Sequence, residues 1–246
     1  MIHAAYAMVL GPRFRQEDCL LVDQKVVQNK EMVAPQWITV PQEQALFAVA
    51  DGIGGGEAGD WASRSVCQAF ASWNGVGVST FLQQVQGQIA TAAKPGYSPG
   101  STLAGLLVDG EQVTAIGVGD SFVLRVGAAG IEPLNHPHSW VQGQLDKGHI
   151  TPDEVKGHPY RNVITLGFGA AFAAAWGKGR PAPSIETHSW QPGEGFLICS
   201  DGLATVLEAA DIDTLLEPLG LDAAQRLLER VRVTATDNAA FILLWR

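Results

Sequence analysis

The chain has 246 residues, of which 46% are hydrophobic and 17% are charged. This length and apolar content suffice for one domain with a sizeable core, so we expect residues 1–246 to form a single domain. The net charge of −9, without any lysine and arginine cluster, argues against nucleic acid or an anionic membrane as a partner and is compatible with bound cations. Apolar runs too short for a membrane span and the lack of a signal-peptide pattern predict a cytoplasmic protein.

The first half of the chain alternates short apolar runs with two helical patterns. Residues 19–22 and 46–50 have the length and apolar bias of buried strands, and the polar residues 24–44 between them are expected at the surface. Apolar side chains at helical spacing over residues 58–73 predict a helix, and a second helix is expected from Ser79 to a point before Pro95.

The second half is richer in strands. Residues 103–108, 113–118 and 122–126 predict an antiparallel meander, and residues 127–183, with many glycines and weak periodicity, predict an insertion. Beyond it we expect two strands, one helix and a final strand, at residues 184–190, 195–200, 222–231 and 239–245. Because strands and helices are grouped rather than alternating, the pattern favours an α+β fold with antiparallel sheets flanked by helices.

Two of the apolar runs end in the same dipeptide. Residues 46–50 lead into Asp51-Gly52, and residues 196–200 lead into Asp201-Gly202. Asp-Gly is a common turn dipeptide, and a turn is the favoured interpretation for either one alone. Two strands that bring carboxylates to one edge of a core, however, would repel each other by about 4 kcal/mol at ~4 Å unless a cation lay between them. The pair therefore indicates a metal site.

Other acids also border apolar segments. Glu17 and Asp18 precede the strand at 19–22, Asp237 precedes the last strand, and Asp120 lies between two strands of the expected meander. Such oxygen ligands suit Mg2+ or Mn2+ rather than zinc or copper. Two such ions about 3.5 to 4 Å apart would lower the pKa of a bridging water and clamp a phosphoryl oxygen.

An arginine lies close to these acids in the chain. Arg13 precedes Glu17 by a few residues, and a guanidinium near two metals is well shaped for bidentate contact with a phosphate. Arg15 competes with Arg13 for this role, because both are within reach of the same acids.

Six short segments, in this order, resemble motifs of the metal-dependent protein phosphatases, the PPM or protein phosphatase 2C family, in its bacterial form. They are Arg13-Phe14-Arg15-Gln16-Glu17-Asp18, Asp51-Gly52-Ile53-Gly54-Gly55, Gly100-Ser101-Thr102, Gly119-Asp120-Ser121, Ser200-Asp201-Gly202-Leu203 and Asp237-Asn238. The stretch from His138 to Thr165 resembles the flap of the bacterial members, which makes residues 127–183 the expected flap insertion.

The resemblance implies a central sandwich of two antiparallel β-sheets with helices on both outer faces. It implies hydrolysis of phosphoserine or phosphothreonine on proteins by a water that two Mn2+ or Mg2+ ions activate. The ligands it implies are four carboxylates and one backbone carbonyl, from Asp18, Asp51, Asp201, Asp237 and Gly52. It further implies that Glu17 stands behind these ligands or holds a metal-bound water, that Arg13 binds the phosphate, and that Asp120 helps to hold a third, weaker metal.

Some positions depart from the family pattern. Gln16 stands where asparagine is usual, Phe122 where arginine often follows Asp-Ser, Leu166 where the flap often has arginine, and Ala239 where threonine is frequent. None of them removes an expected metal ligand, so they affect substrate contacts more than catalysis. Ile53 occupies the position of a histidine found in other branches, so no side chain is assigned as general acid.

A function of another class is open to the same fold. A non-catalytic regulator would bind a phosphoprotein, and loss of metal-binding acids would favour it, whereas all the expected acids are present. We therefore expect an active phosphatase, a monomer that acts on phosphorylated proteins, opposes a bacterial Ser/Thr kinase, and binds neither nucleic acid nor membrane.

Overall fold

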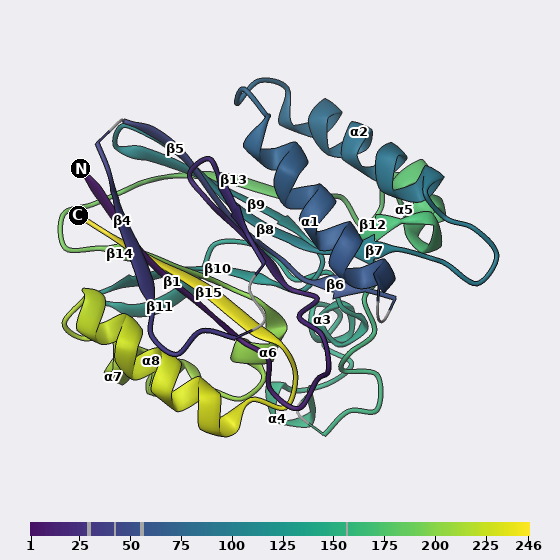
Figure 1. The fold of residues 1–246 in the computed structure, drawn as a ribbon. Helices are drawn as coiled ribbons and strands as arrows, with labels where there is room; N and C mark the ends of the chain where they lie inside the picture. Colours follow the sequence, from purple (N-terminus) through teal and green to yellow (C-terminus); the bar gives the residue numbers. More distant parts are fainter. Residues whose placement is uncertain (29–30, 42, 55–56, 156) are drawn as a thin grey trace.

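Two antiparallel sheets pack face to face, and helices cover both outer faces (Figure 1). A computed structural model describes residues 1–28, 31–41, 43–54, 57–155 and 157–246. Gly55 of the first Asp-Gly motif, and residues 29–30 and 42 of the expected surface segment, lie outside these ranges. The layers confirm the predicted α+β sandwich.

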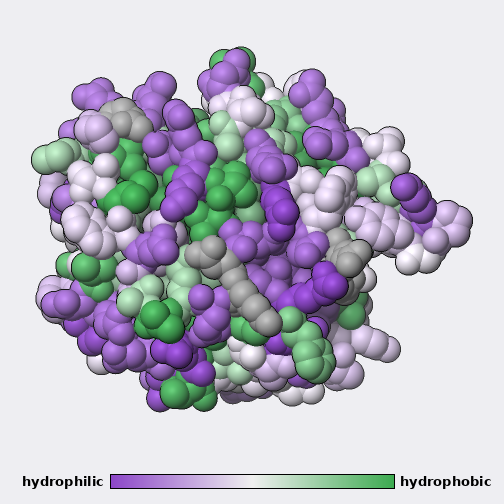
Figure 2. All heavy atoms as spheres, in the orientation of Figure 1, coloured by the Kyte–Doolittle hydropathy of each residue, from purple (hydrophilic) through white to green (hydrophobic). Residues whose placement is uncertain are grey.

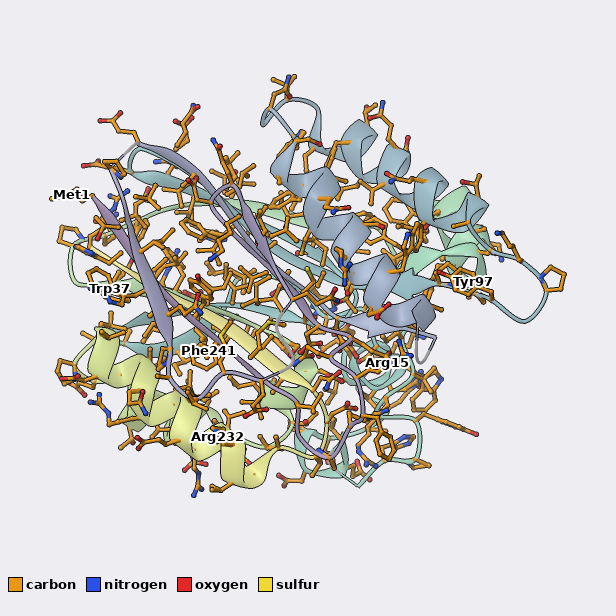
Figure 3. The ribbon with its side chains drawn as sticks, in the orientation of Figure 1. Met1, Arg15, Trp37, Tyr97, Arg232 and Phe241 are labelled. Carbon is orange, nitrogen blue, oxygen red and sulfur yellow. The ribbon has the colours of Figure 1, made fainter. Side chains whose placement is uncertain are left out.

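The first sheet has the strand order β11-β10-β14-β15-β1-β4, and every neighbouring pair is antiparallel. Its strands are β1 (Ile2–Val9), β4 (Gln36–Val40), β10 (Phe122–Gly127), β11 (Gly130–Pro133), β14 (Gly195–Cys199) and β15 (Ala239–Trp245). Phe241 of β15, labelled in Figure 3, belongs to the core, and only 1% of its surface is exposed.

The second sheet has the order β13-β9-β8-β5-β2-β3 and is also antiparallel throughout. Its strands are β2 (Cys19–Val22), β3 (Lys25–Val27), β5 (Gln44–Ala50), β8 (Leu103–Asp109), β9 (Gln112–Val118) and β13 (Ser184–Ser189). A small third sheet joins β6 (Gly52–Ile53), β7 (Gly100–Ser101) and β12 (Phe168–Gly169).

Each sheet has its own pair of covering helices (Figure 1). The helices α1 (Glu57–Ala71) and α2 (Val78–Thr91) cover the second sheet, and their buried apolar side chains form one core cluster with it. The helices α7 (Ala209–Leu216) and α8 (Leu221–Thr234) cover the first sheet and share the larger cluster, which also fills the space between the sheets. The shorter helices are α3 (Trp140–Leu145), α4 (Pro152–Val155), η1 (Ala170–Phe172), α5 (Ala173–Lys178) and α6 (Asp201–Ala204).

The expected surface segment and meander need correction. The segment at 24–44 contains β3 and β4, and the opening residues, for which no element was expected, form β1, between β15 and the edge strand β4 of the first sheet. β8 and β9 are neighbours as expected, but β10 lies in the opposite sheet. Strand partners come from distant parts of the chain, so spacing along the sequence does not reveal which sheet a strand joins.

The predicted insertion overlaps the main sheet at its start. Residues 130–133 form β11, which pairs with β10 through Gly130 and Gly127. The boundaries of a flap within 127–183 therefore stay a prediction. No helix in the described ranges combines the length and the apolar character that a bilayer crossing needs.

Candidate metal centre

Strand alternation directs two of the predicted ligands toward the space between the sheets. Leu20 of β2 packs in the core between the sheets, whereas Cys19 packs under the helices. Because successive side chains of a strand point to opposite faces, Asp18 shares the face of Leu20. Cys19 pairs with Ala50, so Asp18 and Asp51 come next to each other just beyond the ladder.

Asp18 is fully buried where the two sheets end. Its Oδ2 accepts a hydrogen bond of 2.8 Å from the hydroxyl of Ser200, 182 residues away in the sequence. Its backbone N–H donates to Oε1 of Gln16 at 3.0 Å. Burial outweighs the Ser200 hydrogen bond and, together with the charge of Asp201, raises the pKa of Asp18 to about 8.

Asp51 is held from the opposite side by Thr102. The backbone N–H of Asp51 donates to Oγ1 of Thr102 at 3.0 Å, and the N–H of Thr102 donates to the carbonyl of Asp51 at 2.9 Å. Oγ1 of Thr102 also lies 2.8 Å from the hydroxyl of Ser121. Burial, and then the charges of Asp18 and Asp201, hold the pKa of Asp51 well above its usual range.

The first sheet contributes Asp201 and Asp237 to the same end of the sandwich. Asp201 opens α6 directly after β14, and Asp237 lies just before β15. A Cβ atom on Gly202 would stand 1.8 Å from the carbonyl oxygen of Asn238, so only glycine allows these two segments to approach so closely. Burial, with the charge of Asp237, raises the pKa of Asp201.

Asp120 reaches the cluster from the turn after β9. It is 8% exposed, and burial and the charge of Asp201 raise its pKa to about 7. Oδ1 of Asp120 and Oδ1 of Asp18 are buried and have no hydrogen-bond partner within the described residues. Buried carboxylate oxygens without a donor are costly, so a ligand for them is expected on energetic grounds.

Arg13 and Glu17 flank the four aspartates. The exposed guanidinium of Arg13 donates through Nη2 to Oδ2 of Asp237, and this contact raises the pKa of Arg13 above its usual range. The backbone N–H of Glu17 donates to Oδ1 of Asn238 at 2.8 Å. A Cβ on Gly59 of α1 would stand 2.4 Å from Oε2 of Glu17, so α1 begins against this carboxylate.

Arg15, the competitor of Arg13, points elsewhere. Its Nη1 lies 3.9 Å from Oδ2 of Asp60 on the first turn of α1. The two arginines therefore face different surroundings, and among the contacts of the described residues it is Arg13 that reaches an aspartate of the cluster.

Four carboxylates with raised pKa values, from Asp18, Asp51, Asp120 and Asp201, form together with Asp237 a donor set that suits a hard divalent cation. The fit is strengthened by Oδ1 of Asp18 and Oδ1 of Asp120, which are buried and have no hydrogen-bond partner within the described residues. Among the described residues, however, no three His, Cys, Asp or Glu side chains already stand as a complete metal-binding group. The ligand assignment to Asp18, Asp51, Gly52, Asp201 and Asp237 therefore stays a prediction, as do the roles of Glu17 and Asp120.

Three polar residues position the acids and were assigned no role from the sequence. Ser200 bonds Asp18 and accepts from the N–H of Ala240 at 3.0 Å, which joins the two sheets at the site. Thr102 and Asn238 hold backbone groups of other site segments. All three lie within or beside the motifs, but their partners are remote in the sequence, so spacing carries no signal for these contacts.

Comparison with known proteins agrees with this architecture. The family model described as "Protein phosphatase 2C" matches residues 34–236. The serine/threonine protein phosphatase PstP of Mycobacterium tuberculosis is 31% identical over 218 residues, which cover 80% of this chain and 40% of that protein. The solved structure of the serine/threonine phosphatase Stp1 from Staphylococcus aureus superposes with a TM-score of 0.81 at 25% identity, over 100% of this chain and 95% of the other.

A further solved structure, the catalytic domain of PstP in complex with 2 manganese ions, superposes with a TM-score of 0.72 at 22% identity over 99% of this chain and 98% of that one. The chain thus spans about 40% of the length of the M. tuberculosis relative. The family model and the M. tuberculosis relative each match most of the residues of this chain. The chain therefore belongs to the protein phosphatase 2C family.

Proposed function

We propose that this chain is a metal-dependent protein phosphatase that hydrolyses phosphoserine and phosphothreonine on proteins. The observation that carries the proposal is the meeting of acids from both sheets at one end of the sandwich, with an exposed arginine in contact with one of them. Membership of the protein phosphatase 2C family supports it, as do relatives named serine/threonine phosphatases.

We assign two Mn2+ or Mg2+ ions to Asp18, Asp51, Asp201, Asp237 and the carbonyl of Gly52. The manganese-bound PstP domain supports two ions and this metal. Glu17 stands behind the ligands, and Asp120 helps to hold a third, weaker ion. Bound there, such ions would make water a nucleophile at neutral pH and stabilise charge on the phosphoryl oxygens.

The side chains of the protein then hold and orient the substrate. Arg13, 57% exposed, presents a planar fork of N–H donors that matches a phosphate group, while Asp237 keeps the fork in place from the other side. Buried Ser200 and Thr102 restrain Asp18 and Asp51, so little reorganisation is needed when phosphate binds.

The proposed substrates are proteins that a bacterial Ser/Thr kinase has phosphorylated. The phosphatase acts on them as a monomer in the cytoplasm. A non-catalytic regulator that binds a phosphoprotein through the same fold is the alternative. The complete set of acids favours the enzyme, because a regulator needs no buried carboxylates that repel one another.

The test is phosphate release from a phosphothreonine peptide with Mn2+, with Mg2+ and with excess chelator. We expect metal-dependent turnover that Asp201→Asn abolishes by weakening a shared ligand, and that Asp222→Asn, at an exposed acid on α8, retains. Near-wild-type activity of Asp201→Asn at limiting metal would refute the role of Asp201. No turnover with either metal, in folded protein, would favour the regulator.

A further inference from the structure

A shallow hollow of about 230 Å³ lies beside the candidate metal centre. It is lined by Phe14, Arg15, Gln16, Gln28, Asp60 and Arg64. Three of these residues, from Phe14 to Gln16, directly follow Arg13 in the chain, so the hollow adjoins the segment that carries the proposed phosphate contact. The same hollow is bordered by the start of α1, whose Gly59 packs against Glu17.

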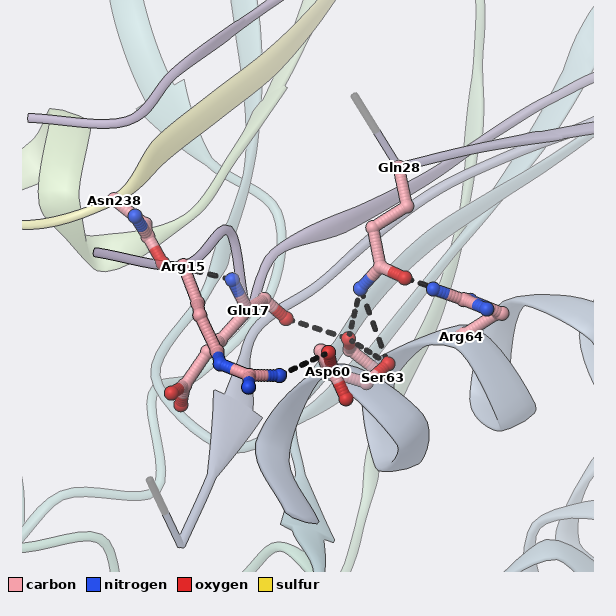
Figure 4. A network of polar contacts seen from close by, with 7 residues as sticks. All are labelled: Arg15, Glu17, Gln28, Asp60, Ser63, Arg64 and Asn238. Carbon is pink, nitrogen blue, oxygen red and sulfur yellow. Dashed lines mark hydrogen bonds and ion pairs between the residues drawn. The ribbon is translucent and has the colours of Figure 1, made fainter. Parts of the chain in front are cut away.

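The cations of the hollow are held in place by a polar network (Figure 4). Nε of Arg64 donates to Oε1 of Gln28 at 2.7 Å, and Nε2 of Gln28 donates in turn to the carbonyl of Asp60 at 3.1 Å and to the hydroxyl of Ser63 at 3.2 Å. Arg15 approaches Asp60 from the opposite side. Asp60 and Arg64 are four residues apart on α1 and so share one face of that helix.

The resulting surface is cationic and exposed in a protein whose net charge is −9. Arg64 is exposed, and half of the Arg15 side chain is exposed. Each guanidinium has five N–H donors, which is more than one neighbouring carboxylate or amide can engage, so both side chains can take a further acceptor beside the contacts they already make. Figure 2 shows hydrophilic side chains gathered on this face, where the loop before β2 meets the start of α1.

Phe14 gives the hollow an apolar wall. Its side chain is 95% exposed, although it lies between two arginines, and burying an aromatic ring of this size against a partner is favourable. An exposed aromatic ring beside two arginines suits a peptide segment better than a small anion, because a peptide offers both a charge and apolar surface.

We propose that this hollow binds the carboxylate of an aspartate or glutamate that flanks the phosphorylated residue in the substrate. The inference rests on the proposed function and refines its substrate class to phosphosites in an acidic context. Arg15 and Arg64 receive the carboxylate, Phe14 covers the adjacent stretch of peptide, and Gln28 sets the orientation of Arg64.

The experiment compares phosphothreonine peptides that differ only by glutamate or glutamine at one position, on either side of the phosphorylated residue. The readout is the ratio of kcat/KM for the two peptides within each protein, which cancels any general effect of a substitution. We expect a ratio of about five for each arginine engaged at the favoured position. We expect this ratio to fall toward one at about 1 M salt, where the Debye length is only about 3 Å.

Variants of the lining separate charge from structure. Arg15→Gln and Arg64→Gln should each lower the ratio, Arg64→Lys should keep part of it, and Arg64→Glu should shift the preference to a lysine peptide. Arg232→Gln is the matched control, because Arg232 is likewise exposed and ion-paired but lies on α8, away from Arg15 (Figure 3).

Turnover of p-nitrophenyl phosphate, which carries no peptide, tests the phosphatase activity separately from the acidic subsite. Suppose that the wild-type enzyme hydrolyses this ester and both peptides, and that the kcat/KM ratio of the two peptides is one at every position. This result overturns the acidic subsite and leaves the proposed phosphatase activity in place. A ratio that survives Arg15→Gln and Arg64→Gln also overturns the subsite. Absence of metal-dependent turnover of every substrate overturns the proposed function and the subsite with it.

Discussion

Replacing Asp18 with asparagine should stabilise the metal-free protein. Asp18 is fully buried, and its Oδ1 has no hydrogen-bond donor among the described residues. Asparagine keeps an oxygen that can accept from Ser200, and it offers an N–H group to the neighbouring carboxylates in place of a charge. The substitution thus removes a carboxyl whose ionisation the fold disfavours, with little change in shape.

The magnitude follows from the raised pKa. The carboxyl has a pKa of about 8 in the fold against a usual value of 3.8, so the unfolded chain ionises first as pH rises. The free energy of unfolding of the wild type therefore has its full value below pH ~4. It falls by about 1.4 kcal/mol per pH unit between pH ~4 and pH ~8 because of this carboxyl. At pH 7 the wild-type carboxyl lowers stability by about 4 kcal/mol, which asparagine avoids; in a chain of this size that is roughly 10 °C in Tm.

Urea unfolding followed by tryptophan fluorescence, in excess chelator at pH 4.5 and pH 7, measures this difference. We expect Asp18→Asn to exceed the wild type at pH 7 and nearly to match it at pH 4.5, while Asp222→Asn follows the wild type. Added Mn2+ should narrow the gap, because a ligand that binds the native wild type stabilises it. If Asp18→Asn were no more stable than the wild type in chelator at pH 7, the reasoning from the raised pKa of Asp18 would be refuted.

Three further substitutions test the other contacts of the site. Arg13→Ala should reduce kcat/KM for a phosphopeptide about 10- to 100-fold, mainly through KM and with metal affinity little changed, as steady-state kinetics and metal titration would report. Gly202→Ala should lower the free energy of unfolding by about 1–3 kcal/mol or more, measured by urea, because its methyl group would meet the carbonyl of Asn238 at 1.8 Å. Thr102→Val should cost about 1–3 kcal/mol in the same assay, since it leaves the N–H of Asp51 without its acceptor.

Each of these has a contrary outcome. An unchanged KM in Arg13→Ala would move the phosphate contact to Arg15 or to no arginine. Wild-type stability in Gly202→Ala would mean that α6 and the start of β15 can separate without cost. Wild-type stability in Thr102→Val would mean that water replaces the hydroxyl at Asp51.

Local pattern determined much of this protein. The apolar runs at 19–22 and 239–245 match β2 and β15 residue for residue, and the apolar stripe at 58–73 matches α1 closely. Burial of one face imposes a period on the sequence, and that period can be read without knowing the partner. The Asp-Gly dipeptides that follow two apolar runs likewise predicted, from local sequence alone, that Asp51 and Asp201 lie where strands end.

Tertiary structure decided which strands are neighbours and what the acids touch. β10 joins the sheet opposite β9, and β1 pairs with β15 across almost the whole chain, because sheet pairing depends on contacts between remote segments. The Ser200–Asp18 hydrogen bond and the Arg15–Asp60 approach have no counterpart in local spacing. The sequence by itself therefore specified many of the elements and the acids, whereas long-range packing decided that Arg13 faces the cluster and Arg15 faces the hollow beside it.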